Sequence, residues 1–271
     1  MSTATLRGAD HVRIGEVASV AERRAALALS RGGAEKTYPH RDPNEDVAAF
    51  ALSEWGALAV VADGHAGALA AEAAVQHVLE AHAGRWLDPA PIALDVRFTA
   101  EAVDVACDVN VAILKATTGS RSDRSRTTLS VALLRPRDGW LAALSVGDSH
   151  AFLAGRDRVR ELAPLGAESV YLGDPALGRE RIEDGVRVEL ARLDAGEDAC
   201  ALVLATDGLS EKGIGVRDPA GAVQLAVLEG AATQPDLRPL HAARGLVQRA
   251  IAAHRDHRSG DNAAAAVLWL D

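Results

Sequence analysis

Short apolar segments bounded by turn residues are the feature that most constrains how this chain can fold. Each segment holds four to seven residues, a length and setting that favour buried β-strands. We predict strands at Ala25–Ser30, Val47–Ser53, Ala57–Ala62, Leu129–Arg135, Trp140–Val146, Ala151–Ala154, Ala201–Thr206 and Ala263–Trp269. Residues 135–139 carry Pro, Asp and Gly between two of these strands, which predicts a hairpin turn.

Helical periodicity is limited to three segments. Apolar residues recur at helical spacing from Ala71 to His82 and from Phe98 to Ile113, with Thr99 suited to cap the second helix. A third helix is predicted over His241–His254. Because strands and helices do not alternate regularly, a doubly wound parallel sheet is disfavoured. The order instead favours an α+β fold of antiparallel sheets with helices packed outside.

The segment from Gly155 to Gly196 differs from the rest of the chain. It is rich in Gly, Pro, Asp and Glu and has weak periodicity, so we predict an exposed excursion and not a separate domain. No internal repeat or low-complexity linker divides the 271 residues. That length is ample for one large domain with a sizeable core.

Charge and cysteine content exclude several classes of function. The net charge is −9, which disfavours nucleic acid and anionic membrane surfaces as partners. No signal peptide and no apolar run of membrane-spanning length is present in the sequence. Cys107 and Cys200 lie in apolar contexts, so we predict buried free thiols in a reducing compartment. The cytoplasm is the expected location.

Acidic residues flank five of the predicted strands. They are Glu45 and Asp46 before one strand, Asp63, Asp148 and Asp207 after three others, and Asp261 before the last. A single Asp next to Gly is usually a turn residue. The repeated context, however, would place these carboxylates together at one sheet rim if the strands are neighbours.

Converging carboxylates need compensation. At about 4 Å and an effective dielectric near 20, each like-charge pair is unfavourable by roughly 4 kcal/mol. Such a cluster therefore takes up protons or binds cations, and oxygen ligands without thiolates favour Mg²⁺ or Mn²⁺ over Ca²⁺. Two such cations close together suit phosphoryl chemistry.

Other candidate ligands are weaker. No Cys-rich or His-rich spacing indicates a zinc site, and His254 and His257 are interpreted as solvated histidines at a helix end. Arg41 lies three residues before Asn44 and offers a bidentate fork for phosphate, although on the sequence alone it could equally be a surface charge.

Six motifs in order carry a family resemblance. They are RDPNED, VVADGHAG, SRTTLSVALL, SVGDSHAFL, LATDGLSEK and SGDNAAAAVLWL. Together they resemble the protein phosphatase 2C family, the metal-dependent serine/threonine phosphatases. The resemblance covers a catalytic domain at residues 22–271, with residues 1–21 as an N-terminal extension that could be partly ordered and about residues 155–196 in the place of the family's flap.

The resemblance implies a four-layer α-β-β-α sandwich, in which two stacked antiparallel sheets are flanked by helix pairs. It also implies a centre of two Mg²⁺ or Mn²⁺ ions, the choice between them left open. Asp63 matches the bridging carboxylate and Gly64 a carbonyl ligand of one metal. Asp207 and Asp261 match ligands of the other metal, and Asp148 matches a ligand of a third, weaker metal that it shares with Asp207.

Further roles follow from the same resemblance. Glu45 and Asp46 match the acidic pair that holds metal-bound waters. Arg41 matches the phosphate-binding arginine, and His65 matches a histidine proposed in some members as the general acid. The implied reaction is direct hydrolysis of phosphoserine or phosphothreonine in proteins by a hydroxide that bridges the metals.

Departures from the family pattern leave alternatives open. Arg126, His150 and Ala264 stand where the family often has Gly, Arg and Thr, and the flap segment lacks the family's Asp-His-Ser. The alternatives are a catalytically weak module that binds a phosphorylated partner, and the same metal chemistry on a small phosphorylated molecule. Neither cysteine lies in a Cys-x₅-Arg loop, which argues against a cysteine phosphatase. We expect a monomer that acts on targets of a Ser/Thr kinase.

Overall fold

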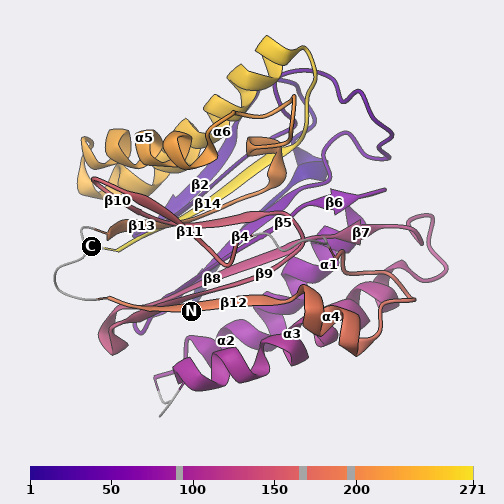
Figure 1. Cartoon of the computed structure of the whole chain (residues 1–271), viewed down its shortest axis with the longest axis horizontal. Coiled ribbons are helices and arrows are strands. Elements are labelled where there is room, and N and C mark those ends of the chain that lie inside the picture. Colours follow the sequence, from indigo (N-terminus) through magenta and orange to yellow (C-terminus); the bar gives the residue numbers. More distant parts are fainter. Residues whose placement is uncertain (90–93, 165–169, 194–198, 271) are drawn as a thin grey trace.

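The computed structural model describes residues 1–89, 94–164, 170–193 and 199–270. Two six-stranded antiparallel sheets stack face to face, and helices cover the outer face of each (Figure 1). The predicted α+β sandwich is therefore confirmed. None of the helices in these ranges combines the length and apolarity needed to cross a membrane.

Each sheet draws its strands from distant parts of the chain. The first sheet has the order β1 (Ser2–Arg7), β4 (Val47–Leu52), β5 (Ala57–Ala62), β8 (Leu129–Arg135), β9 (Trp140–Val146) and β12 (Arg187–Arg192). The second has the order β11 (Val159–Leu162), β10 (His150–Gly155), β13 (Ala199–Ala205), β14 (Ala263–Trp269), β3 (Ala25–Ser30) and β2 (Ala18–Glu22). A separate short pair joins β6 (Gly64–His65) to β7 (Arg126–Thr127).

Helices form the two outer layers. Against the first sheet lie α1 (Leu69–His77), a π-helical turn η2 (Val78–Ala83), α2 (Gly84–Trp86), α3 (Leu94–Thr117) and α4 (Arg179–Gly185). Against the second sheet lie α5 (Pro219–Ala231) and α6 (Arg238–His257). Short 3-10 turns occur at η1 (Gly8–Asp10), η3 (Pro136–Asp138), η4 (Asp207–Leu209) and η5 (Pro235–Leu237).

The continuous apolar character of the central strands follows from burial on both faces. In β4, Phe50 packs between the sheets, whereas the adjacent Ala49 and Ala51 pack against the helices. Strands covered on both sides lose the polar alternation of half-exposed strands. All eight predicted strands are present, five with the predicted ends and three with ends that differ by one or two residues, and β8 and β9 form the predicted hairpin.

Edge strands and two helices, α4 and α5, were not predicted. The predicted exposed excursion at residues 155–196 contains β11, α4 and β12, and β12 pairs with β9 at the edge of the first sheet. Charged residues in these half-exposed elements mask their periodicity. The helix α5 was missed because its sequence, PAGAVQLAVLEGA, has almost no polar face. Residues 1–21 supply β1 and most of β2, one edge strand for each sheet.

The cysteines differ from expectation in burial. Neither Cys107 nor Cys200 forms a disulfide within the described residues, as predicted, but both are only half-buried. Partial burial raises the pKa of the Cys107 thiol.

Candidate metal centre

Strand ends from both sheets deliver acidic side chains to one end of the sandwich. Val47 pairs with Ala62, so Asp46 and Asp63 leave adjacent antiparallel strands at the same rim. The second sheet joins this rim through Thr206, whose Oγ1 donates to Asp46 Oδ2 at 2.7 Å. We call Glu45, Asp46, Asp63, Asp148, Asp207 and Asp261 the carboxylate cluster.

The electrostatics of the cluster show that its negative charge is only partly compensated. Burial, and then repulsion from Asp207 and Asp46, raises the pKa of Asp63 well above its ordinary value. Burial and repulsion from Asp261 do the same to the pKa of Asp207. The same two causes raise the pKa of Asp46 to about 7. The arrangement is unfavourable unless protons or cations neutralise it.

The donor set fits divalent cations. Among the described residues, the buried oxygens Oδ1 of Asp46, Asp148 and Asp207 have no hydrogen-bond partner. One donor atom each from Asp63, His65 and Asp148 lies within 4.8 Å of the others. Buried carboxylate oxygens without a partner are costly, and hard cations such as Mg²⁺ and Mn²⁺ take oxygen ligands of this type.

Backbone contacts fix Asp63 and Gly64 in place. The Asp63 amide donates to Thr128 Oγ1 at 2.9 Å, and Thr127 Oγ1 donates to the Asp63 carbonyl at 2.9 Å. A Cβ at Gly64 would lie 2.5 Å from the carbonyl oxygen of Glu45. Only glycine therefore permits this close approach, and the strand pair β6–β7 holds it there.

The loop before β4 holds Glu45 from several sides. Its Oε1 accepts the backbone N–H groups of Arg41 and Asp42, each at 3.2 Å. Its own amide donates to Asn262 Oδ1 at 2.8 Å, which ties this loop to the one before β14. The two loops that carry Glu45 and Asp261 therefore form one unit.

Lys36 and Tyr38 belong to the cluster, although the sequence analysis did not single them out. Lys36 Nζ lies 3.4 Å from Asp261 Oδ1 and 3.5 Å from Glu45 Oε2, and its side chain is only 4% exposed. Tyr38 donates its hydroxyl to Asp261 Oδ1. Burial would lower the pKa of Lys36, but attraction to Asp261 and Asp46 outweighs it and raises that pKa. The only sequence signal for Lys36 was its place as a basic residue shortly before the acidic pair Glu45 and Asp46.

His65 faces the cluster from β6. Its Nε2 lies 3.8 Å from Asp63 Oδ2, and its ring meets Tyr171 edge-on with centroids 4.6 Å apart. Tyr171 in turn donates its hydroxyl to Asp148 Oδ2 at 2.5 Å, so the segment after β11 contacts the cluster directly. Burial lowers the pKa of His65 despite the attraction of Asp148.

Arg41 lies at the exposed margin of the cluster. Its guanidinium Nη1 donates to the carbonyl oxygen of Arg121, while its backbone is held by Glu45. The side chain is exposed, in contrast to the buried Lys36. Of the two cations, Arg41 is the one that solvent reaches.

His254 has a structural role, and His257 does not. His254 is fully buried, so the interpretation as a solvated histidine is wrong for this residue, whereas His257 is exposed as expected. The ring of His254 accepts the Gly33 N–H at Nδ1 (3.2 Å) and donates from Nε2 to the Gly208 carbonyl (2.7 Å). It thus joins the end of α6 to two loops, one of which begins at Asp207.

His150, one of the departures from the family pattern, also has a structural role. Its Nδ1 lies 2.6 Å from Glu161 Oε1 and its Nε2 lies 2.5 Å from Ser210 Oγ. The ring stacks on Phe152 with centroids 5.4 Å apart. His150 therefore links β10, β11 and the turn after Asp207.

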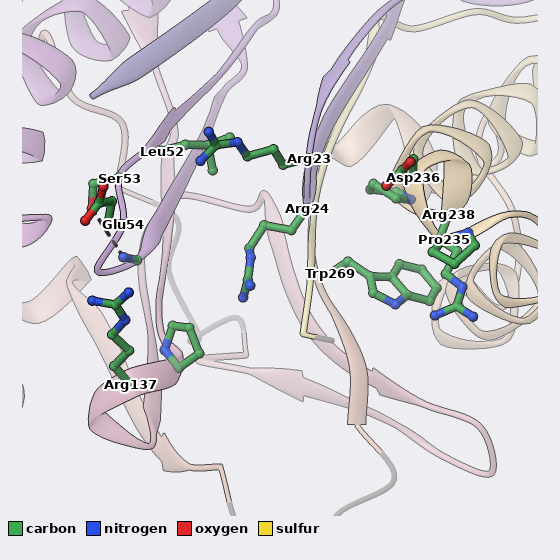
Figure 2. A pocket seen from close by; sticks show the side chains of 13 residues that line it. Arg23, Arg24, Leu52, Ser53, Glu54, Arg137, Pro235, Asp236, Arg238 and Trp269 are labelled. Atoms are coloured by element: carbon green, nitrogen blue, oxygen red, sulfur yellow. Dashed lines mark hydrogen bonds between the residues drawn. The ribbon is translucent and has the colours of Figure 1, made fainter.

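A cavity of about 880 Å³ lies at the opposite end of the sandwich (Figure 2). Arg23 and Arg24, in the turn between β2 and β3, line it together with Arg137 and Trp269. Arg137 stacks over the Trp55 ring at 4.7 Å. Cationic side chains outnumber the carboxylates of Glu54 and Asp236 in its lining, in contrast to the carboxylate cluster.

Comparisons with known proteins agree with this fold. A family model described as Protein phosphatase 2C matches residues 36–244. A comparison with curated proteins returns no significant match.

Solved structures with the same fold include a bacterial serine phosphatase, with 16% identity, a TM-score of 0.65 and coverage of 92% of this chain and 98% of that one. The serine/threonine phosphatase Stp1 from Staphylococcus aureus has 16% identity, a TM-score of 0.63 and coverage of 96% and 98%. The PPM Ser-Thr phosphatase MsPP from Mycobacterium smegmatis in complex with cacodylate has 20% identity, a TM-score of 0.54 and coverage of 93% and 100%. At these identities the likeness establishes the fold.

Proposed function

This chain belongs to the protein phosphatase 2C family and is a protein serine/threonine phosphatase, and we propose that it hydrolyses phosphoserine and phosphothreonine with Mg²⁺ or Mn²⁺ held by its carboxylate cluster. The observation that carries the proposal is the set of buried aspartate oxygens without partners among the described residues. Cations are the compensation that such oxygens require for a phosphate dianion to approach.

We propose the ligand roles that the family resemblance implies. Asp63, with the Gly64 carbonyl, would bridge two cations. Asp207 and Asp261 would complete the second cation's ligands, and Asp148 would serve a third, weaker site. Support comes from the shared rim and from the mutual repulsion that raises the pKa values of Asp63 and Asp207.

The remaining residues act on the substrate and on water. Bound cations of this kind hold phosphate and acidify a bound water, which supplies the nucleophile. Glu45 and Asp46 would orient waters by accepting their hydrogen bonds. Arg41 would leave the Arg121 carbonyl and bind two phosphate oxygens, because its guanidinium is exposed and fork-shaped.

His65 has the least direct role. Its lowered pKa leaves the ring mainly neutral at pH 7, so it would deliver a proton to the leaving alcohol only after taking one from water. We propose His65 as an auxiliary acid whose contribution depends on the leaving group.

The test is hydrolysis of p-nitrophenyl phosphate by the purified protein with Mn²⁺ or Mg²⁺. We expect turnover that requires the cation and is lost in Asp207→Asn. Absence of cation-dependent turnover in the parent protein would overturn the proposal in favour of a phospho-binding module. Comparing a phosphothreonine peptide with phosphorylated metabolites then separates protein substrates from small molecules.

The proposal extends to the enzyme's substrates, cellular location and oligomeric state. We propose that its substrates are targets of a Ser/Thr kinase and that it acts as a cytoplasmic monomer. Support for the cytoplasm comes from the two cysteines, Cys107 and Cys200, which form no disulfide within the described residues.

A further inference from the structure

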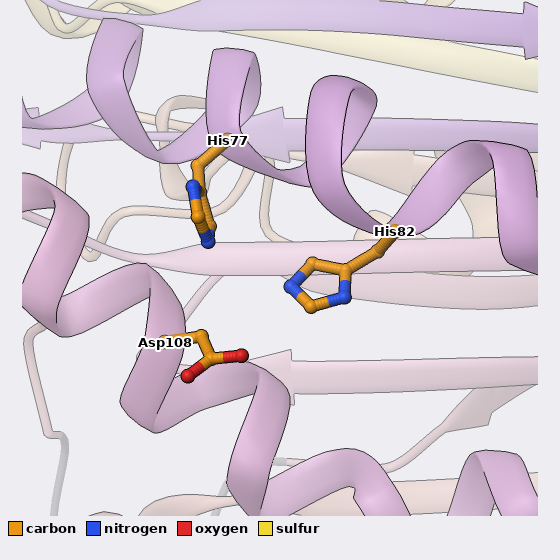
Figure 3. Close-up of side chains that lie close together, drawn as sticks. All are labelled: His77, His82 and Asp108. Carbon is orange, nitrogen blue, oxygen red and sulfur yellow. The ribbon is translucent and has the colours of Figure 1, made fainter.

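A second group of ligand-type side chains lies in the helical layer over the first sheet. His77 ends α1, His82 lies in the π-helical turn η2, and Asp108 lies on α3. One donor atom from each lies within 4.8 Å of the other two. Figure 3 shows the three side chains directed into a common gap between the helices. We call these residues the imidazole cluster.

The π-helical turn is what brings the two histidines together. In a regular α-helix, residues five apart point about 140° away from each other around the axis. A π-turn is wider, since its hydrogen bonds join residues five apart, and single π-turns recur at functional sites. The turn Val78–Ala83 thereby places His82 on the same face as His77. Their rings meet edge-on, with centroids 5.5 Å apart.

His82 is an incompletely satisfied buried group. It is only 5% exposed, and its Nε2 has no hydrogen-bond partner within the described chain. Its ring is fixed by stacking on Trp86, with centroids 5.4 Å apart. A buried imidazole nitrogen without a partner is costly and calls for a ligand. Figure 3 shows this ring directed toward the gap between His77 and Asp108.

We propose that His77, His82 and Asp108 bind one transition-metal ion of the Zn²⁺ class, separate from the catalytic cations. Two imidazoles and one carboxylate are a donor set that suits Zn²⁺, whereas Mg²⁺ prefers oxygen ligands alone. His77 is half-buried and Asp108 is exposed, so solvent reaches the site and water can complete a tetrahedron.

Small side-chain movements complete the geometry. Ligand atoms of a tetrahedral zinc site lie about 3.3 Å apart, given zinc–ligand distances of about 2 Å. The present spacing is wider by up to about 1.5 Å. The side chains of His77 and Asp108 can close this difference because neither is locked in the core.

The neighbouring Arg85 is compatible with a bound cation. Its Nη2 lies 3.4 Å from His82 Nδ1 but only 3.0 Å from Glu101 Oε2. Metal binding at Nε2 would turn Nδ1 into a donor, and Arg85 would then keep Glu101 as its partner. The ion would cross-link the α1–α2 segment to α3. Both belong to the helical layer over the first sheet.

The test is calorimetric titration of the full-length protein with Zn²⁺ at pH 7.5 in excess Mg²⁺, which occupies the carboxylate cluster. We expect one additional Zn²⁺ site. Because loss of an outer-shell partner alone weakens metal sites by about tenfold to a hundredfold, His77→Ala and Asp108→Asn should each weaken Zn²⁺ binding by at least that factor. His257→Ala, an exposed histidine elsewhere, should leave it unchanged.

Two further measurements keep the proposal falsifiable. Co²⁺ in place of Zn²⁺ should give the visible absorption of a tetrahedral site in the parent protein and lose it in His77→Ala, which spares the fold because His77 is only half-buried and lies outside the apolar core. The Asp207→Asn variant should keep the extra Zn²⁺ site. Loss of that site in Asp207→Asn, or equal Zn²⁺ affinity in the parent protein and His77→Ala, would overturn the proposal.

Discussion

The carboxylate cluster and the imidazole cluster are built from different secondary structures and differ in charge. Strand ends of two sheets converge on the first, and its buried oxygens repel one another strongly enough to raise the pKa of Asp63 and Asp207. Two helices form the second, and its buried ring is neutral. Without an ion, the first therefore stores repulsion, whereas the second only leaves a nitrogen unsatisfied. Neutralising a carboxylate of the first cluster should therefore raise the melting temperature of the metal-free protein, whereas the second cluster holds no repulsion to relieve.

The largest effect should come from Asp63→Asn. We expect kcat with Mn²⁺ to fall by about a hundredfold to a thousandfold, as for loss of one major electrostatic contribution. The metal-free protein should melt at a higher temperature, because the amide removes one repelling charge. Steady-state kinetics and thermal melts in EDTA measure the two effects. Asp256→Asn, exposed on α6, is the matched control, and a lower melting temperature of metal-free Asp63→Asn would contradict stored repulsion.

Lys36→Met should sharpen the comparison through stability. Removing one partner of a buried ion pair destabilises proteins by about 3 kcal/mol or more, so metal-free Lys36→Met should melt well below the parent. Saturating Mg²⁺ should narrow this gap, since bound cations take over part of the compensation. Denaturant unfolding with and without Mg²⁺ measures it, and Lys212→Met is the exposed control. A gap that does not depend on Mg²⁺ would show that Lys36 acts by packing alone.

His65→Ala tests the one imidazole inside the carboxylate cluster. Since general acids contribute most when the leaving group is poor, we expect a loss of about tenfold or more on a phosphoserine peptide and a smaller loss on p-nitrophenyl phosphate. The ratio of kcat/KM on the two substrates reports the effect. Equal losses would argue against proton donation by His65.

The smallest effect concerns pH and the imidazole cluster. Burial, then Arg85 and His77, lowers the pKa of His82 from 6.5 to about 4, against the opposing pull of Asp108 and Glu101. The unfolded chain therefore takes up a proton that the native state resists. This contribution to stability is complete above pH 6.5 and is lost as the pH falls toward 4. Melting of the metal-free protein should show it, and His82→Gln should flatten the profile. An unchanged profile in His82→Gln would place the titration elsewhere.

The two clusters also differ in how far the sequence predicted them. The aspartates lie beside strands that are apolar throughout, so their convergence could be expected from the pattern alone. For Lys36 the only sequence signal is a basic residue before the acidic pair, and Tyr38 has none, because the contacts of both depend on how a loop folds back. The pair His77 and His82 has a spacing that a regular helix would separate, and only the π-turn unites it.

The sequence likewise predicted only part of the fold. The central strands were predicted because burial on both faces leaves them uniformly apolar, and the family resemblance supplied the stacking of the sheets. The half-exposed β12 and the nearly apolar α5 lack a clear period, and β1 alternates over only six residues. Their places are set by which edges and faces remained uncovered, and single-sequence periodicity does not carry that information.

The edge strands β1 and β2 have a consequence for handling the protein. They hydrogen-bond to β4 and β3 and so terminate one side of each sheet. Proteolytic trimming of the first 22 residues would uncover two rows of unpaired backbone N–H and C=O groups. Such rows recruit strands from other molecules. The trimmed protein should therefore aggregate through its sheet edges while its catalytic residues remain intact.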